Sequence, residues 1–393
     1  MKKTDRDAII EHATQMKRLV HDPNSFVTEL LVQQQQYYCI EWLCHFDVLS
    51  CIPLPPDALP YAEVAARANV PVSTLRSVAR MAMTVGFLCE TRDGHLSHSP
   101  LSAPFVENVH MRTELLQMFS KTVLLMTGLT PATEKWGDTT APNETAYNLV
   151  HKTDLPFFQH LESRPDLSDG FSAYMKSRAV SHTGLSAEHL LDAFDWKSLG
   201  EATVVDVGGS SGSTATMLAT TYPKLKLVVQ DLPGPISNAR SQVLKLSEDV
   251  KSRISIMEYD FFTPQPVRGA DIYLLRTILH DWPDIDAIKI LRRIVEAMGP
   301  SSRLLIMDVV LPKPGSGSTT FEAILRQKDL TMIQAFNAKE READEWGALL
   351  TQAESRLIIH AIERPEGSEL SVIEARLGSS NGVELTTGAN EHT

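Results

Sequence analysis

Residues 204–219 read VVDVGGSSGSTATMLA, an apolar run that leads into a glycine-rich turn and then into a helix. Gly208, Gly209 and Gly212 permit a tight turn and a close approach of the backbone to a ligand. Their spacing is G-G-x-x-G rather than G-x-G-x-x-G, the pattern whose open turn and free helix-terminal N–H groups suit a pyrophosphate. The turn therefore predicts a ligand site and favours a cofactor other than NAD.

Acidic residues after the next two apolar runs support a nucleoside ligand. Asp231 ends the second run, where a carboxylate can accept hydrogen bonds from both hydroxyls of a ribose. The pair Asp260-Phe261 follows the third run, in a position to hold the amine and the ring of an adenine. The glycine turn, Asp231 and Asp260-Phe261, in this order, predict a cofactor that contains adenosine.

Apolar runs alternate with helical stretches from residue 203 to the end of the chain. Continuous Val, Ile and Leu runs between helices indicate a parallel sheet covered on both faces. Only a short polar link separates the last two runs, so we expect them to form an antiparallel hairpin. The runs read TVVDVGG, KLVVQDL, RISIMEYDFF, DIYLLRTIL, RLLIMDVVLP, RLIIHAIE and LSVIEARL. The C-terminal half is therefore predicted to be an α/β domain.

Residues 274–294 read LLRTILHDWPDIDAIKILRRI and contain the change from the fourth strand to a helix. Ligands bind at the carboxyl ends of strands in such sheets, so Arg276–Trp282 are expected to face the site. Asp281 is interpreted as a residue that caps the helix, and Pro283 suits the first helical turn. His280 lies before the cap on the strand-to-helix loop, a position that favours a catalytic role over a structural one.

The first fifty residues are predicted to be helical up to a stop at Pro53. An apolar face this early in a chain is expected to pack on the same chain, with a dimer contact as the alternative. Its members recur at steps of three and four: Leu30, Leu31, Tyr37, Ile40, Leu43 and Phe46.

Residues 59–102 predict a helix near 61–68, a turn, a helix that begins near Ser73, and a hairpin of strands 87–90 and 95–98. Asp93-Gly94 is a strong signal for the hairpin turn. This order is that of a winged helix, a motif that often binds DNA.

Charge argues against a nucleic-acid or membrane partner. The chain of 393 residues has a formal net charge of −12, whereas DNA and anionic membranes favour Lys and Arg surfaces. The second helix of the winged helix offers only Arg76 and Arg80 as cations. A scaffold or dimerisation role is therefore favoured over DNA recognition. No apolar run approaches the length of a bilayer span, and residues 1–13 lack the apolar core of a secretory signal.

The cysteines give no sign of a disulfide or a metal site. None of them forms a C-x-x-C pair, so they are interpreted as free thiols in a reducing cytoplasm. They are Cys39, Cys44, Cys51 and Cys89.

Residues 101–200 are predicted to be mainly helical and rich in Met and aromatic side chains. Core packing explains most of these side chains, but some, such as Met175, could line a flat aromatic substrate pocket.

The chain resembles the plant and fungal O-methyltransferases of the caffeic acid type, from its N-terminal helices to Leu377. The motifs that carry the resemblance are VVDVGGSSG, VVQDLPG, DFF, LLRTILHDWPD, DVVLP, KDLTM and KERE. The resemblance implies a winged-helix dimerisation and lid domain over 1–180, a Rossmann-like class I methyltransferase domain over 181–378, and a flexible tail over 379–393. It also implies a homodimer and a cytoplasmic enzyme of secondary metabolism that acts on a natural product.

The resemblance implies S-adenosylmethionine as the cofactor and assigns the residues that hold it. These residues, with Gly209 as the second glycine of the turn, are Gly208, Gly209, Asp231, Leu232, Asp260, Phe261 and Arg276. It further implies that Trp282, Asp329, Met332 and Lys339 lie near the substrate pocket.

His280 is the general base that the resemblance implies, with Asp308 and Glu340 on either side of the imidazole and no metal. A phenol with a pKa near ~10 is a poor nucleophile at neutral pH. A neutral imidazole can take its proton as attack begins, and a carboxylate on the other ring nitrogen fixes the tautomer. The sulfonium supplies the electrophile.

Two departures from the family pattern surround this site. The usual glycine before KER is Ala338, and the Ser or Thr that usually follows is Glu342. The alternative is a related fungal enzyme that binds S-adenosylmethionine but catalyses dehydration or pericyclic ring formation on a polyketide or pyridone. The intact His280, Asp308 and Glu340 favour methyl transfer.

Overall fold

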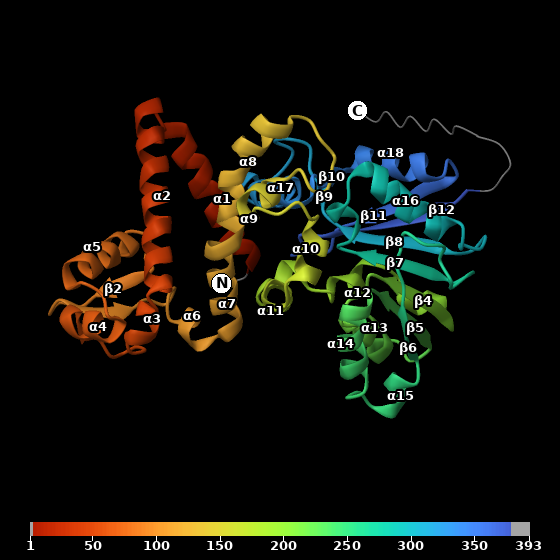
Figure 1. Cartoon of the computed structure of the whole chain (residues 1–393), viewed down its shortest axis with the longest axis horizontal. Coiled ribbons are helices and arrows are strands. Elements are labelled where there is room, and N and C mark those ends of the chain that lie inside the picture. The colour runs from red at the N-terminus through yellow and green to blue at the C-terminus, as the bar shows by residue number, and fades with distance from the viewer. Residues whose placement is uncertain (1–2, 379–393) are drawn as a thin grey trace. The chain divides into compact units, whose positions relative to one another are not determined.

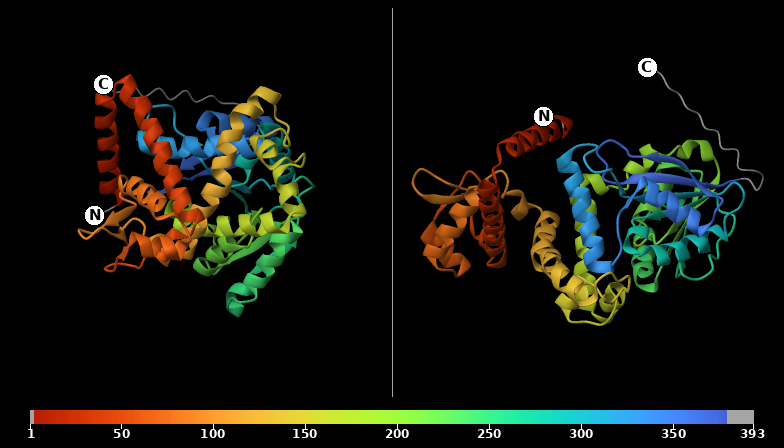
Figure 2. Two further views of the ribbon diagram at one scale, coloured as in Figure 1. Left: turned by 60° about the vertical axis from the view of Figure 1, so that its left-hand side comes forward. Right: turned by 90° about the horizontal axis from the view of Figure 1, so that it is seen from above.

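The computed structural model describes residues 3–378 and contains two compact units (Figures 1 and 2). The first unit extends to Thr183 and also includes Ser318–Ile324. The second comprises Gly184–Gly317 and the chain from Leu325 onward. The tail predicted over 379–393 lies outside the described residues. Every described helix falls short of the length and apolar character needed to cross a bilayer.

The first unit is mostly helical, and Figure 2 shows its two long N-terminal helices joined by a short turn. Its helices are α1 (Lys3–Val20), α2 (Pro23–His45), α3 (Val48–Cys51), α4 (Tyr61–Ala68), α5 (Val72–Met83), α6 (Pro104–Glu107), α7 (Val109–Gln117), the π-helical turn η1 (Met118–Thr122), α8 (Val123–Trp136), α9 (Ala146–His151), α10 (Phe157–Ser163) and α11 (Pro165–Ser181). This confirms the helical prediction for residues 3–51 and for the first part of 101–200.

The helix–turn–helix–hairpin order predicted for residues 59–102 is present. Helices α4 and α5 precede β2 (Leu88–Glu90) and β3 (His95–His98), and β1 (Leu59–Pro60) completes a sheet of order β1-β3-β2. Leu75 on α5 and Leu96 on β3 are fully buried in one apolar cluster.

The apolar face of α2 differs from its prediction. Leu43 near the end of the helix is fully buried, as expected for packing on the same chain. Leu30 and Leu31 are 50% and 64% exposed, and Phe46 just after the helix is 40% exposed. The first half of α2 therefore presents apolar side chains outward, and the expectation that this face packs on the same chain is wrong there.

The second unit is a seven-stranded sheet of order β11-β12-β8-β7-β4-β5-β6. Neighbours from β8 to β6 are parallel, whereas β12 is antiparallel to both β8 and β11. The strands are β4 (Ala202–Val207), β5 (Leu225–Asp231), β6 (Ile254–Glu258), β7 (Ile272–Arg276), β8 (Arg303–Asp308), β11 (Leu357–Glu363) and β12 (Ser371–Leu377), with a separate parallel pair of β9 (Val310–Leu311) and β10 (Arg341–Glu342). The parallel sheet with a C-terminal antiparallel hairpin is confirmed.

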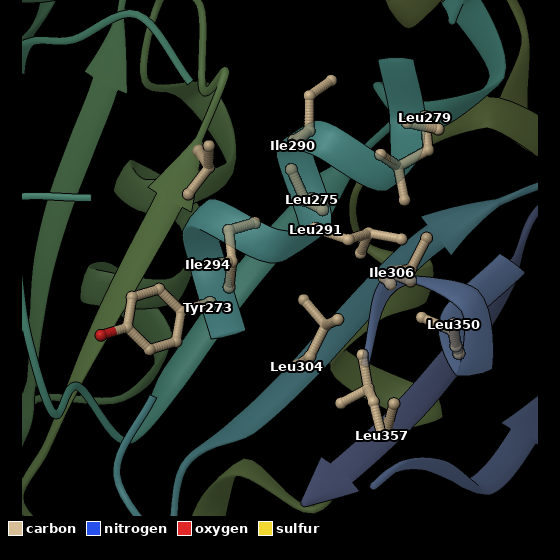
Figure 3. Close-up of a cluster of buried hydrophobic side chains, with 14 of the residues drawn as sticks. Tyr273, Leu275, Leu279, Ile290, Leu291, Ile294, Leu304, Ile306, Leu350 and Leu357 are labelled. Atoms are coloured by element: carbon tan, nitrogen blue, oxygen red, sulfur yellow. The ribbon is translucent and has the colours of Figure 1, made fainter. Parts of the chain in front are cut away.

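Helices connect these strands and cover the sheet. They are η2 (Thr183–Leu185), α12 (His189–Ala193), η3 (Trp196–Leu199), α13 (Ser213–Thr221), α14 (Pro233–Val243), α15 (Glu248–Lys251), η4 (Leu279–Asp281), α16 (Asp284–Val295), α17 (Thr319–Phe336) and α18 (Ala343–Ala353). Figure 3 shows Leu291 of α16 and Leu350 of α18 packed on Leu275, Leu304 and Ile306 of the strands. All five side chains are fully buried.

Strand order places the ligand site. The chain leaves β4 toward β5 and β6 and then returns to the other side of β4 to form β7 and β8. The connections therefore diverge at the carboxyl ends of β4 and β7, which is where ligands bind in open α/β sheets.

Candidate active site

The glycine turn after β4 is tightly packed at Gly208 and Gly209. Gly208 has φ +74°, and a Cβ there would lie 2.4 Å from Cδ1 of Ile278, in the loop after β7. A Cβ on Gly209 would lie 2.7 Å from Oδ2 of Asp206. The amides of both glycines donate to the carbonyl of Gln230 on β5, at 2.8 and 3.0 Å. The turn is thus held between the ends of β5 and β7 and leads directly into α13.

Asp231 at the end of β5 is tied to the same turn. Its Oδ2 accepts a hydrogen bond from the amide of Ser210 at 2.8 Å, and its Oδ1 accepts one from the amide of Leu232 at 2.7 Å. Burial raises the pKa of Asp231, and these two amides oppose the rise. Leu232 beside it is 40% exposed. The structure therefore places Asp231 at the end of β5 and at the edge of the glycine turn.

Asp260 and Phe261 follow β6. Oδ1 of Asp260 accepts a hydrogen bond from the amide of Phe262 at 2.9 Å, which fixes the turn after the strand. The ring centroid of Phe261 lies 5.7 Å from that of Trp282 in an edge-to-face arrangement. The ring centroid of Phe262 lies 4.8 Å from the same Trp282 ring. Trp282 therefore packs against the segment proposed to hold an adenine.

Asp206 is a site residue that the sequence analysis missed. It is 2% exposed within β4, and its Oδ2 has no hydrogen-bond partner among the described residues. Burial raises its pKa to about 7, although the charge of Arg276 acts in the opposite direction. Arg276 donates to the carbonyl of Leu185 at 2.6 Å, but its Nε has no partner in the described chain. A charged residue inside the run VVDVGG was the signal that could have revealed Asp206.

His280 lies on η4, just after β7, among three carboxyl groups. Its Nδ1 is 2.9 Å from Oε1 of Glu340 and 3.6 Å from Oδ1 of Asp308. Its Nε2 is 3.5 Å from Oδ1 of Asp281. Burial alone would lower the pKa of His280, but the three negative charges outweigh it and raise the pKa to about 10. The imidazole is therefore a strong base in a fixed orientation.

The carboxyl groups around His280 are themselves perturbed. Asp308 ends β8 fully buried, and neither of its oxygens has a hydrogen-bond partner among the described residues. Burial raises its pKa to about 7, while the charge of His280 lowers it. Burial likewise raises the pKa of Asp281 to about 6. Strong perturbation of several adjacent groups is typical of a reaction centre.

Asp281 does not cap the following helix, so that interpretation is wrong. The N-cap position of α16 is Pro283, and no side chain caps the helix. Asp281 instead belongs to η4 and lies beside Nε2 of His280. In the sequence, Asp281 lies just before the helix, a position that suits an N-cap. In the structure it belongs to a 3-10 turn, which directs its carboxyl group to the imidazole.

The residues expected near the substrate lie on several elements. Oδ1 of Asp329 on α17 accepts a hydrogen bond from the amide of Glu340 at 3.0 Å. Met332 is half-buried on the same helix, and Met175 on α11 of the first unit is 46% exposed. Nζ of Lys339 lies 2.7 Å from Oε1 of Glu345, so its ammonium is already held by a carboxylate.

The departure at Glu342 has a structural explanation. Glu342 is the N-cap of α18 and forms a capping box with Glu345. The acidic side chain of Glu342 therefore caps the helix N-terminus here, as a Ser or Thr hydroxyl does in many other helices. Ala338 is buried at 3% exposure.

A metal ion has no obvious ligands here. Among the described residues, no group of three or more His, Cys, Asp and Glu side chains could hold one. The four cysteines are free thiols.

Comparison with known proteins gives a consistent result. A model of the O-methyltransferase domain family matches residues 139–355, more than half of the chain. The O-methyltransferase fsr2 of Gibberella fujikuroi is 70% identical over 97% of this chain and 98% of its own length.

Solved structures share the fold. A LepI variant in complex with SAH and a substrate analogue has a TM-score of 0.79 and 23% identity, and the match covers 96% of this chain and 95% of that one. The O-methyltransferase NcsB1 from neocarzinostatin biosynthesis, in complex with S-adenosylmethionine and 2-hydroxy-5-methyl naphthoic acid, has a TM-score of 0.69 and 27% identity. That match covers 87% of this chain and 96% of NcsB1.

Proposed function

Because this chain belongs to the O-methyltransferase family, whose methyl donor is S-adenosylmethionine, we propose that it methylates a hydroxyl group with His280 as general base. The acceptor is a phenolic or polyketide-derived small molecule of secondary metabolism. The observation that carries the proposal is the position of His280, between Glu340 on Nδ1 and Asp281 on Nε2.

Proton transfer from a phenol fits the basicity of this imidazole. A phenol has a pKa near ~10, and the three carboxyl groups raise the pKa of His280 to about 10. Transfer of the proton is then close to balanced in free energy, and the imidazolium that forms is stabilised by Glu340 and Asp308. Only the deprotonated fraction of the imidazole can act, so we expect the rate to increase with pH above neutrality.

The residues at the carboxyl ends of β4, β5 and β7 fit the cofactor. S-adenosylmethionine supplies an electrophilic methyl group when bound. Asp231 offers a carboxylate for the ribose, and the glycine turn allows the backbone to approach the ligand. The amino-acid end of the cofactor carries an ammonium and a carboxylate, and Asp206 and Arg276 offer buried polar atoms of opposite charge.

The substrate class is supported by the pocket residues and by a neighbour. Trp282 directly follows the turn that carries His280, and Met332 is a half-buried side chain of α17; both suit a flat ring, since Met contacts aromatic rings well. NcsB1 holds a hydroxynaphthoic acid in its solved structure. The pericyclase alternative is supported by the likeness to LepI. At 23% identity, that likeness shows a shared fold and no more.

The first unit supports dimerisation rather than DNA binding. Arg80 on α5 forms a two-point ion pair with Glu90, and Arg76 lies over the ring of Tyr61 at 5.0 Å. Both cations of this second helix of the predicted winged helix are thus engaged within the chain. The exposed apolar side chains of α1 and α2 favour a homodimer, and the free thiols suit a cytoplasmic enzyme.

A label-transfer assay tests the proposed function. The protein is incubated with methyl-labelled S-adenosylmethionine and a panel of hydroxynaphthoic acids, hydroxylated anthraquinones and simple phenols. The same compounds with the hydroxyl already methylated are the matched controls. We expect label on a hydroxylated compound and none on its methylated control. Acceptors that cyclise without label, and only when the cofactor is present, would instead support the pericyclase alternative.

A further inference from the structure

Arg341 is a fully buried arginine in the segment that follows Glu340. Its Nε and one terminal nitrogen donate to Oδ1 of Asp284 at 2.9 and 2.7 Å. The same terminal nitrogen donates to the carbonyl of Trp282 at 3.0 Å. The other donates to the carbonyls of Leu279 at 3.0 Å and Lys339 at 3.4 Å. These five bonds match the five N–H donors of a guanidinium.

Two of these bonds are made to backbone carbonyls on either side of His280, the proposed base. Leu279 and Trp282 come immediately before and after the dipeptide His280-Asp281. One rigid guanidinium therefore holds the backbone at the first residue of η4 and just after its last residue, on both sides of the imidazole. A 3-10 turn of three residues has few hydrogen bonds of its own, so its position depends on such outside contacts.

Neighbouring residues of one segment thus hold the base in two ways. Oε1 of Glu340 lies 2.9 Å from Nδ1 of His280 and orients the ring. Arg341 belongs to β10, whose pairing with β9 places it opposite Val310, just after the strand that ends in Asp308. Successive side chains of extended backbone point to opposite sides, so Glu340 reaches the ring while Arg341 reaches the turn behind it.

The surroundings of the guanidinium fix its geometry. Its central carbon lies 5.2 Å from the ring centroid of Trp346, which is fully buried. Burial tends to raise the pKa of Asp284, but bonds from Arg341 and the charge of Lys339 lower it, so the carboxylate stays ionised. A lysine here would keep the charge but would lose the planar fork that binds the two carbonyls and Asp284 together.

We propose that Arg341 is a positioning residue for His280, whose guanidinium sets the distance from the imidazole to Glu340 by clamping the turn from behind. The inference rests on the proposed function of His280. The charged and titratable groups that face the imidazole are Glu340, Asp308 and Asp281, and the charge of Arg341 also opposes the rise that burial causes in the pKa of Asp308.

The test is the titration of the His280 imidazole by NMR, with its signal assigned from the His280→Gln variant. Arg341→Lys keeps the positive charge and removes the fork, whereas Arg341→Met removes both. Arg356→Lys is the matched control, because Arg356 forms an exposed pair with Glu354. Calorimetry with S-adenosylhomocysteine gives the folded fraction of each variant.

In Arg341→Lys we expect the pKa of His280 to fall by about one unit or more as the ring separates from Glu340. Turnover per cofactor-binding site with an accepted phenol should fall by roughly 10²-fold, as for an ångström-scale misplacement. A purely electrostatic role would leave Arg341→Lys unchanged and raise the pKa of His280 in Arg341→Met, and that result would overturn the proposal. So would an unshifted titration in both variants.

If Arg341→Lys does not fold, Asp284→Asn serves instead, since Asp284 is 48% exposed and holds the guanidinium from outside. We expect a smaller fall in the pKa of His280, and an unchanged titration would overturn the proposal. Failure of the proposed function would show separately, as methyl transfer that survives in His280→Gln.

Discussion

At the scale of single residues, the proposed role of His280 predicts that the charge around its imidazole sets the pH dependence of the enzyme. Removal of the negative charge at Glu340, 2.9 Å from Nδ1, destabilises the imidazolium and therefore lowers the pKa of His280 from about 10. In Glu340→Gln we expect the increase of kcat/KM with pH to move down by about 1 to 3 units. The maximal rate should also fall, because an amide holds the ring tautomer less firmly.

The pH–rate profile of Glu340→Gln checks this expectation, with the surface variant Glu354→Gln as control. Glu354 pairs with Arg356 away from His280, so its profile should match that of the wild type. A midpoint in Glu340→Gln that stays in place or moves upward would contradict the electrostatic account of the base.

The sequence reveals functional residues that stand at a recognisable position in the chain, such as a strand end. It does not reveal functional residues whose role depends on contacts with distant segments. Asp231 ends β5 and His280 follows β7, and a strand end is visible as the last residue of an apolar run. Asp281 and Arg341 owe their roles to a 3-10 turn and to a buried clamp between distant segments. Neither contact has a local sequence pattern, so both were missed.

At the scale of elements, the glycine turn between β4 and α13 makes a specific prediction. An added Cβ at Gly208 would lie 2.4 Å from Ile278, and the φ of +74° is unfavourable for other residues. Gly208→Ala should lower the affinity for S-adenosylmethionine at least tenfold and destabilise the protein by about 1–2 kcal/mol.

Calorimetry and thermal unfolding measure both effects. Gly347→Ala is the matched control, because Gly347 lies within α18 and an added Cβ would meet its nearest neighbour at an ordinary 4.0 Å. Wild-type cofactor affinity in Gly208→Ala would show that this turn does not form the cofactor site.

Most of the strands could be predicted because buried parallel strands are continuous apolar runs. The helices of the first unit were predicted as helices, but the exposure of one face was not. A helical period in α2 predicts a shared apolar face, but in the structure Leu43 is fully buried whereas Leu30 and Leu31 are 50% and 64% exposed. The period does not indicate whether the partner surface belongs to the same chain.

At the scale of the whole molecule, that outward face predicts self-association. Exposed apolar side chains that gather on two adjoining helices are typical of an interface. They include Ile9, Met16 and Leu19 on α1 and Val27, Leu30 and Leu31 on α2. Leu31→Glu should convert a dimer into a monomer, as measured by light scattering after size exclusion.

Leu244→Glu is the matched control, because Leu244 is 70% exposed on the second unit. It should leave the mass unchanged. A wild-type protein that is monomeric at micromolar concentration, or a Leu31→Glu variant that stays dimeric, would contradict the proposed role of this face.

The central claim is that His280 removes the proton during methyl transfer from S-adenosylmethionine. The most direct test compares His280→Ala with the wild type in single-turnover methyl transfer to an accepted phenol, with cofactor affinity measured in parallel. The account predicts a rate that falls by roughly 10²- to 10⁴-fold while the affinity for S-adenosylhomocysteine is retained. A His280→Ala variant that transfers methyl groups at the wild-type rate would contradict it.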